Sequence, residues 1–340
     1  STRKESSAAS DVYKRQQPMK ILQRLLCVAA AGALSASAVA ADSYPSQPIT
    51  LVNPYAAGGP ADVLGRALAR ELEKQLGKTV IVENKAGGGA AIGANFVARA
   101  KPDGYTLLLG TSAAHVVTPL MQQTPYDGIK DFAFVSIVAN QPNMLVVRPT
   151  LKAENIEQLI AMARKEPGRI NYASAGPGSS PHLGAELFRE RAGVDIVHIP
   201  YSGAAPAIND LVGGQVDMAV LNLAASLQFI RSGRLKALAY ANDKRSPLLP
   251  DVPTLAESGV KGAESASWYS LAAPKGTPPE VLQRLNDAVA KVNANPEYAK
   301  LMQAQGVDLW NMMPQEATAF VEKDQTAMRK LVQAAGLMKK

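Results

Sequence analysis

The sequence predicts an α/β protein built from two blocks, each a parallel sheet covered by helices. Short apolar segments alternate with longer segments of helical periodicity over most of the chain. Loops rich in glycine and serine separate the two kinds of segment. Two extended segments, near 147 and 268, divide this pattern into two similar blocks. Such alternation is typical of βαβ units with right-handed crossovers.

The first block begins with a strand over 49–53 and a helix over 61–76. Leucine recurs every fourth residue along that helix, and Gly77 ends it. The pattern then predicts a strand over 79–82, a helix over 90–100 and a strand over 105–109.

The second block begins after an extended segment over 143–149. It repeats the same rhythm, with strands expected over 170–173, 195–199, 216–220 and 235–239, and helices over 154–166, 180–191, 204–213 and 223–231. Residues 242–267 are rich in Pro, Gly and Ser and indicate a connector. A strand over 268–274 returns, and three helices follow over 279–294, 296–305 and 314–335. We therefore expect one lobe from 44–147 plus 268–340, and a second from 148–267.

The N-terminal segment has the pattern of a secretory signal peptide over 19–41. Lys20 and Arg24 precede an apolar run, and Ala38-Val39-Ala40 forms a small-x-small cleavage site. Residues 1–18 precede this segment and are interpreted as an upstream or non-native extension. A buried N-terminal helix and acylation of Cys27 are the alternatives. The signal predicts export to the periplasm.

The composition excludes several function classes. The net charge of +7 falls to +3 once residues 1–41 are removed, because 30 basic and 27 acidic residues remain. No basic run interleaved with aromatic residues is present, so a nucleic-acid footprint is missing. Cys27 is the only cysteine, so the remaining chain uses no disulfide and no thiolate metal site.

Four loops follow predicted strands and open predicted helices, at 54–62, 110–113, 174–182 and 201–205. Ligands bind at the carboxyl ends of strands in open α/β sheets. Glycines allow close backbone approach, and the first N–H groups of a helix attract anions. The loops contain no Lys or Arg, which favours a carboxylate held by amides and hydroxyls. Turn and capping roles are the alternative. The candidate ligand-binding residues are Tyr55, Ala57, Gly58, Gly59, Asp62, Thr111, Ser112, Ser174, Gly176, Gly178, Ser179, His182, Tyr201, Gly203 and Asn222.

Individual residues in these loops leave alternatives open. Asp62 either satisfies the first amides of its helix or meets a ligand donor. Ser179 and His182 would be the residues of a hydrolase, but the loop lacks a nucleophile elbow. No metal ligand set is apparent among the histidines. No cofactor is predicted, since Pro181 stands where a dinucleotide fingerprint needs glycine. Trp268 and Tyr269 on the returning strand favour core packing.

Several motifs recur in order from Tyr44 to the C-terminus. They are Tyr44-Pro45, Pro54-Tyr55 through Gly58-Gly59, residues 82–89 (Val-Glu-Asn-Lys-Ala-Gly-Gly-Gly), 102–106 (Pro-Asp-Gly-Tyr-Thr), 173–179 (Ala-Ser-Ala-Gly-Pro-Gly-Ser), Pro200-Tyr201 and 251–254 (Asp-Val-Pro-Thr). With these motifs the sequence closely resembles the Bug family, the extracytoplasmic binding proteins of tripartite tricarboxylate transporters.

The resemblance implies a periplasmic binding protein of the type II-like Venus flytrap kind, with two Rossmann-like lobes. It implies a small carboxylate ligand, either a mono- or dicarboxylate, an amino acid or an aromatic acid. The loops around Gly58-Gly59 and 174–179 would grip the carboxylate. The partner would be a membrane permease with one large and one small subunit, and the protein would be a monomer without enzymatic activity. A periplasmic sensor and a serine hydrolase are the alternatives.

Overall fold

The computed structural model describes residues 44–334 and 336–339. The chain divides into two units, Ser1–Ser46 and Gln47–Lys340, and the elements below belong to the second. The predicted signal peptide at 19–41 and the extension at 1–18 lie outside the described residues. Within the described part of the chain, no helix is both long and apolar enough to cross a membrane.

The first group of strands is parallel, as the sequence predicts. Strand β1 (Ile49–Asn53) lies between β2 (Val80–Asn84) and β3 (Thr106–Thr111). Helices α2 (Pro60–Leu76) and α3 (Ala91–Ala98) connect them. The four leucines spaced by four residues on α2 are all buried, because this spacing places them on one helix face.

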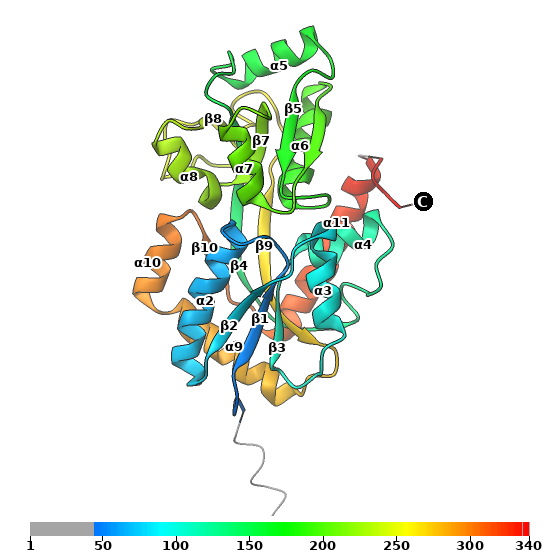
Figure 1. Ribbon diagram of the computed structural model, residues 1–340, viewed down its shortest axis with the longest axis vertical. Coiled ribbons are helices and arrows are strands. Elements are labelled where there is room, and N and C mark those ends of the chain that lie inside the picture. The colour runs from blue at the N-terminus through cyan, green and yellow to red at the C-terminus, as the bar shows by residue number, and fades with distance from the viewer. Residues whose placement is uncertain (1–43, 335, 340) are drawn as a thin grey trace, which may run out of the picture. The chain divides into compact units, whose positions relative to one another are not determined.

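Two long strands carry the chain between the two groups (Figure 1). Strands β4 (Phe132–Val147) and β9 (Ala266–Pro274) pair antiparallel over 132–142 and 266–274. Beyond Pro142, β4 pairs with β7 and β8 instead. Pro142 has no N–H to donate to a ladder, and the change of partner falls at this residue. The expectation of a strand over 143–149 is therefore too short at its start, since β4 begins at Phe132.

The second group again has a parallel core. Strand β5 (Asn171–Ser174) lies between β6 (Val197–Pro200) and β7 (Met218–Asn222), while β8 (Lys236–Tyr240) pairs antiparallel with β4. Its helices are α5 (Ile156–Lys165), α6 (Ser180–Ala192), α7 (Ala204–Val212) and α8 (Leu223–Arg231). The division into two lobes at 147/148 and 267/268 remains a prediction.

The C-terminal elements pack mainly against the first group and β4. They are α9 (Pro279–Asn293), α10 (Pro296–Ala304), the two-residue strand β10 (Asp308–Leu309) and α11 (Pro314–Ala334). Helix α9 contacts α2, and α11 contacts β4 and a π-helical turn at Ala113–Val117. That turn and the following α4 (Thr118–Met121) were not predicted, because the turn is fully buried and α4 has only four residues, so neither shows an amphipathic period.

Candidate functional site

A pocket lies where β1, β3, β5 and β7 end. The space not filled by protein atoms is about 450 Å³ when the open mouth of the pocket is included. The volume in which the centre of a water molecule fits is much smaller, about 30 Å³. The pocket is therefore narrow, and none of its lining side chains carries a charge. It is lined by Tyr55, Gly59, Pro60, Ala61, Thr111, Ser112, Ala113, Ala175, Ser179, Ser180, Pro181, Ala204, Asn222, Ser267 and Tyr269.

Part of the predicted ligand-binding set meets in this pocket. These residues come from both groups of strands, and they are Tyr55, Gly59, Thr111, Ser112, Ser179 and Asn222. The other predicted residues do not line it. They are Ala57, Gly58, Asp62, Ser174, Gly176, Gly178, His182, Tyr201 and Gly203, and their ligand roles stay predictions.

Four helices begin at the pocket wall. Gly59 caps α2 without any side-chain hydrogen bond, Ser179 caps α6, and Ala204 is the first residue of α7. Asn222 occupies the position before α8. The first N–H groups of a helix lack partners within it and carry partial positive charge. An uncharged pocket with such walls favours an anion bound by amides and hydroxyls.

A polar network on β4, β7 and β9 forms one wall. The Asn222 side-chain amide donates to Asn143 Oδ1 at 2.8 Å and to Ser267 Oγ at 2.9 Å. Tyr269 donates its hydroxyl hydrogen to Gln141 Oε1 at 3.1 Å. Because these bonds engage the NH₂ group of Asn222, its side-chain carbonyl oxygen remains as an acceptor for a further partner.

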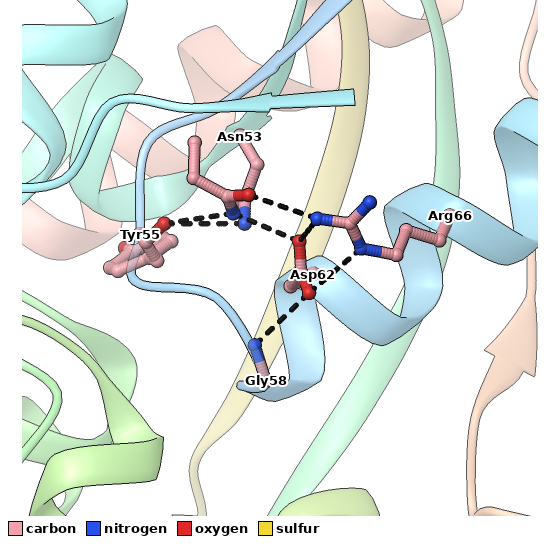
Figure 2. A network of polar contacts seen from close by, with 6 residues as sticks. Asn53, Tyr55, Gly58, Asp62 and Arg66 are labelled. Carbon is pink, nitrogen blue, oxygen red and sulfur yellow. Dashed lines mark hydrogen bonds and ion pairs between the residues drawn. The ribbon is translucent and has the colours of Figure 1, made fainter. Parts of the chain in front are cut away.

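Asp62 does not line the pocket. Figure 2 shows that it lies at the start of α2, within a network of polar contacts that includes Gly58 and Arg66. Its carboxylate accepts hydrogen bonds from Gly58 N–H at 3.0 Å, Arg66 Nε at 3.0 Å and Asn84 Nδ2 at 2.9 Å. Burial raises the pKa of Asp62, but the bonds from Arg66, Gly58 and Asn84 outweigh it and hold that pKa below its usual value. The bond from Gly58 N–H holds the loop ahead of α2, and a ligand role for Asp62 stays a prediction.

We expect Asp62→Ala to cost on the order of 2 kcal/mol in the free energy of unfolding, because three donors lose their charged acceptor. Binding at the pocket should also weaken, since Gly58 and Gly59 lose their anchor. Urea unfolding and ligand calorimetry measure the two effects. Asp62→Asn keeps an acceptor oxygen, so it should lose less stability and less ligand affinity than Asp62→Ala. Equal effects of the two substitutions would contradict this role.

The predicted loop over 174–182 is shaped by bonds among its own residues. Ser179 Oγ donates to Gly176 O at 2.7 Å, and Gly178 N–H donates to His182 Nδ1 at 3.1 Å. Gly176 and Gly178 have φ of 116° and 77°, where a side chain would be strained. Ser174 is fully buried. From this loop, Ser179, Ser180 and Pro181 line the pocket. Ser174, Gly176, Gly178 and His182 do not line it, but they shape the loop that holds those three residues in place.

Two histidines stack behind this loop. The rings of His182 and His198 have centroids 4.2 Å apart, and Tyr172 stacks on His198. His198 Nε2 lies 2.7 Å from Ser174 Oγ. Burial lowers the pKa of His182 to about 4, with a further decrease from His198, while Glu186 opposes the shift. His182 is therefore neutral in the folded protein, with Nδ1 available to the Gly178 amide.

We expect the protein to lose stability between pH 6.5 and 4. Burial also lowers the pKa of His115 to about 4, so the folded chain binds fewer protons than the unfolded chain across this window. Stability is then complete above pH 6.5, falls as the pH falls, and levels off below the folded pKa, with on the order of 3 kcal/mol from each buried histidine. Urea unfolding at several pH values measures this. His182→Asn keeps an acceptor for Gly178 and should flatten the profile; an unchanged slope would contradict the assignment.

The remaining predicted residues lie near the pocket but face elsewhere. Tyr201 donates its hydroxyl hydrogen to Asp210 Oδ2 at 2.7 Å. Gly203 precedes α7, and a Cβ on it would lie 3.2 Å from Ala56 N, so glycine allows the two loops to approach. Ala57 and Gly58 are exposed, and Gly58 borders a different surface hollow.

Several lining residues were not predicted, and they are Pro60, Ala61, Ala113, Ala175, Ser180, Pro181, Ala204, Ser267 and Tyr269. Most are immediate neighbours of predicted residues. Tyr269 was interpreted as core packing; it is indeed buried, but it also borders the pocket. Ser267 and Tyr269 stand two apart on β9, so they point to the same face. The predicted strand begins only at 268 and leaves Ser267 in the connector, so this alternation becomes readable only because β9 begins at Ala266.

Comparisons with known proteins agree on one family. Residues 64–337 match the family described as tripartite tricarboxylate transporter family receptor (TctC). The chain is 39% identical to protein BugT of Bordetella pertussis over 288 residues, which is 84% of this chain and 88% of BugT. The structure of the periplasmic binding protein BugD has a TM-score of 0.84 and 37% identity, covering 87% of this chain and 100% of that chain. An R. palustris protein solved with adipate has a TM-score of 0.84 and 35% identity, covering 86% and 99%.

Proposed function

Because the chain belongs to the TctC family of tripartite tricarboxylate transporter receptors, we propose that it captures a small carboxylate and delivers it to a transporter of this type. Its fold is the α/β fold of periplasmic binding proteins, and the family is one of periplasmic solute-binding receptors. In this proposal the protein reaches the periplasm through the signal peptide at 19–41, acts as a monomer and catalyses no reaction.

The uncharged pocket at four helix starts is the observation that carries the proposal. A carboxylate needs hydrogen-bond donors, and the α2, α6 and α7 starts supply backbone N–H groups from both strand groups. Ser180 Oγ and Ser267 Oγ each accept a bond from an asparagine, so their hydrogens can point to a ligand. Without a lysine or arginine in the wall, such binding is readily reversible.

Closure of two lobes, 44–147 plus 268–340 and 148–267, would explain how the ligand is held. Loops from the two strand groups approach closely beside the pocket: a Cβ on Gly89 would lie 2.4 Å from Pro177 O. A ligand that contacts both groups only when they are close shifts the equilibrium toward the closed state. This supports a clamping role for the loops.

A calorimetric and thermal-shift screen tests the proposal. The compounds are monocarboxylates, dicarboxylates, amino acids and aromatic acids, with the corresponding methyl esters as controls that lack the charge. We expect saturable binding of one molecule per chain for at least one acid and no binding of its ester. A well-folded protein that binds none of the acids would rule the proposal out.

The hydrolase alternative finds no support in the site. Ser179 donates its hydrogen to Gly176 O, and His182 Nδ1 is occupied by the Gly178 amide, so the two side chains are not a nucleophile and base. The Ser174–His198 pair has the required distance, but Ser174 is fully buried. A substrate cannot reach that hydroxyl in this conformation.

A further inference from the structure

A second cavity adjoins the pocket on the side of α11. It offers about 140 Å³ to the centre of a water-sized sphere, several times the corresponding space in the pocket itself. Its wall includes Leu183 and Leu187 of α6, Trp268 of β9, and Met328 and Leu331 of α11. We call this cavity the α11 chamber. Its mainly apolar wall suits the carbon skeleton of a ligand.

The chamber and the pocket share two residues. Ser112, at the end of β3, and Ser180, at the start of α6, line both. The two spaces therefore border each other at these serines. A molecule that reached from the helix starts into the chamber would have to pass Ser112 and Ser180.

The chamber contains an aspartate without a cationic partner. Asp324 Oδ2 accepts from Ser112 Oγ at 2.8 Å and from Trp268 Nε1 at 3.1 Å. Among the described residues nothing donates to Asp324 Oδ1, and no lysine or arginine forms an ion pair with this carboxylate. Burial raises the pKa of Asp324, although the bonds from Ser112 and Trp268 oppose the rise.

The direction of these bonds determines what the site offers to a ligand. Ser112 has one hydroxyl hydrogen and gives it to Asp324, so toward the pocket it can only accept. Asp324 Oδ1 is an acceptor as well. The helix starts supply donors at one end of the combined space, and acceptors with negative charge occupy the other.

We propose that the ligand is a carboxylate with an apolar body and a hydrogen-bond donor, such as an ammonium group, at its far end, which meets Asp324 in the α11 chamber. This inference rests on the proposed function, because it assumes a carboxylate at the helix starts. It also makes Asp324 a specificity-determining residue. A second carboxylate at the far end would be placed against Asp324, and like charges brought together in an interface disfavour binding.

Three matched series of acids test this: ω-amino acids, unsubstituted monocarboxylates and dicarboxylates with four to seven carbons. Calorimetry on the wild-type protein should give the tightest binding for an ω-amino acid and at least about tenfold weaker binding for the dicarboxylate of equal length. Asp324→Asn keeps an acceptor for Ser112 and Trp268. This substitution should weaken the binding of the ω-amino acid and strengthen the binding of the dicarboxylate. The ratio of their affinities should therefore become smaller or reverse.

Glu322→Gln is the matched control, because it removes one negative charge from an exposed position on the same helix. It should leave the ratio unchanged. If a dicarboxylate binds tightest and Asp324→Asn leaves the order intact, Asp324 only supports Ser112 and Trp268 and the inference is overturned, while carboxylate capture stands. If no acid of any kind binds, the proposed function fails and this inference fails with it.

Discussion

Gly59→Val should weaken ligand binding strongly while leaving the protein folded. Gly59 has φ −81° and ψ 172°, an extended conformation that valine adopts readily. A Cβ there would lie 3.6 Å from Ala56 O and 3.9 Å from Ala204 N, at ordinary contact distance. The branched methyl groups would then occupy the space between the α2 and α7 starts. We expect binding to be about 5- to 150-fold weaker, because overpacking a closed site costs about 1–3 kcal/mol.

Calorimetry with a bound acid and a thermal melt of each variant measure these two effects. Gly59→Ala adds only the Cβ and should weaken binding much less. Comparing it with Gly59→Val therefore separates the effect of filling the pocket from the effect of replacing glycine itself. Gly58→Ala provides a contrast, because Gly58 has φ 79° and the substitution should lower stability by about 1 kcal/mol. Unchanged affinity in Gly59→Val would mean that the ligand binds elsewhere.

Gly128→Ala should cause a large loss of stability although it adds only one methyl group. A Cβ on Gly128 would lie 2.0 Å from His115 O and 2.8 Å from His115 Cα. Backbone atoms cannot swing aside as a flexible side chain can. His115 is fully buried, donates from Nδ1 to Gly128 O at 2.7 Å, and packs edge-on against Phe132. We expect a loss above about 3 kcal/mol.

Chemical denaturation of Gly128→Ala and of a matched control measures this loss. Gly213→Ala is the control, because Gly213 has helical φ and ψ at the end of α7. Its added Cβ would lie 3.2 Å from Asn209 O, so we expect a change of no more than about 1 kcal/mol. Similar denaturation midpoints for the two variants would contradict this prediction. They would show that the backbone over 115–128 can move to accommodate the added methyl group.

Local patterns predicted most of the regular elements. The leucine spacing of α2, the apolar segments of β1, β3 and β7, and the proline at the start of α9 each depend on neighbours within a few residues. The start of β4 and the π-helical turn after β3 could not be read in this way. Both are buried on all sides, so no alternation of polar and apolar residues marks them.

In the candidate site, too, local sequence patterns predicted some residues, while the roles of others depend on tertiary contacts. Gly59, Thr111, Ser179 and Asn222 follow strands in the sequence, and the rule that ligands bind at carboxyl ends of strands was enough to select them. Asp62 and His182 stand in the same loops, yet they bond to their own loops and not toward the pocket. The direction of a loop side chain depends on its tertiary contacts, and the spacing of residues in the sequence does not predict these contacts.

By itself, the sequence determined the family, the α/β class and the loops from which an anion site would be built, because these follow from motifs and from local periodicity. Only the tertiary structure decided that Ser267 and Tyr269 of β9 complete the pocket, and that Asp324, more than two hundred residues from Ser112 in the chain, accepts its hydrogen bond. The physical reason is the antiparallel passage of β4 and β9 between the two strand groups. Together with the packing of α11 against β4, it brings distant segments to the same place.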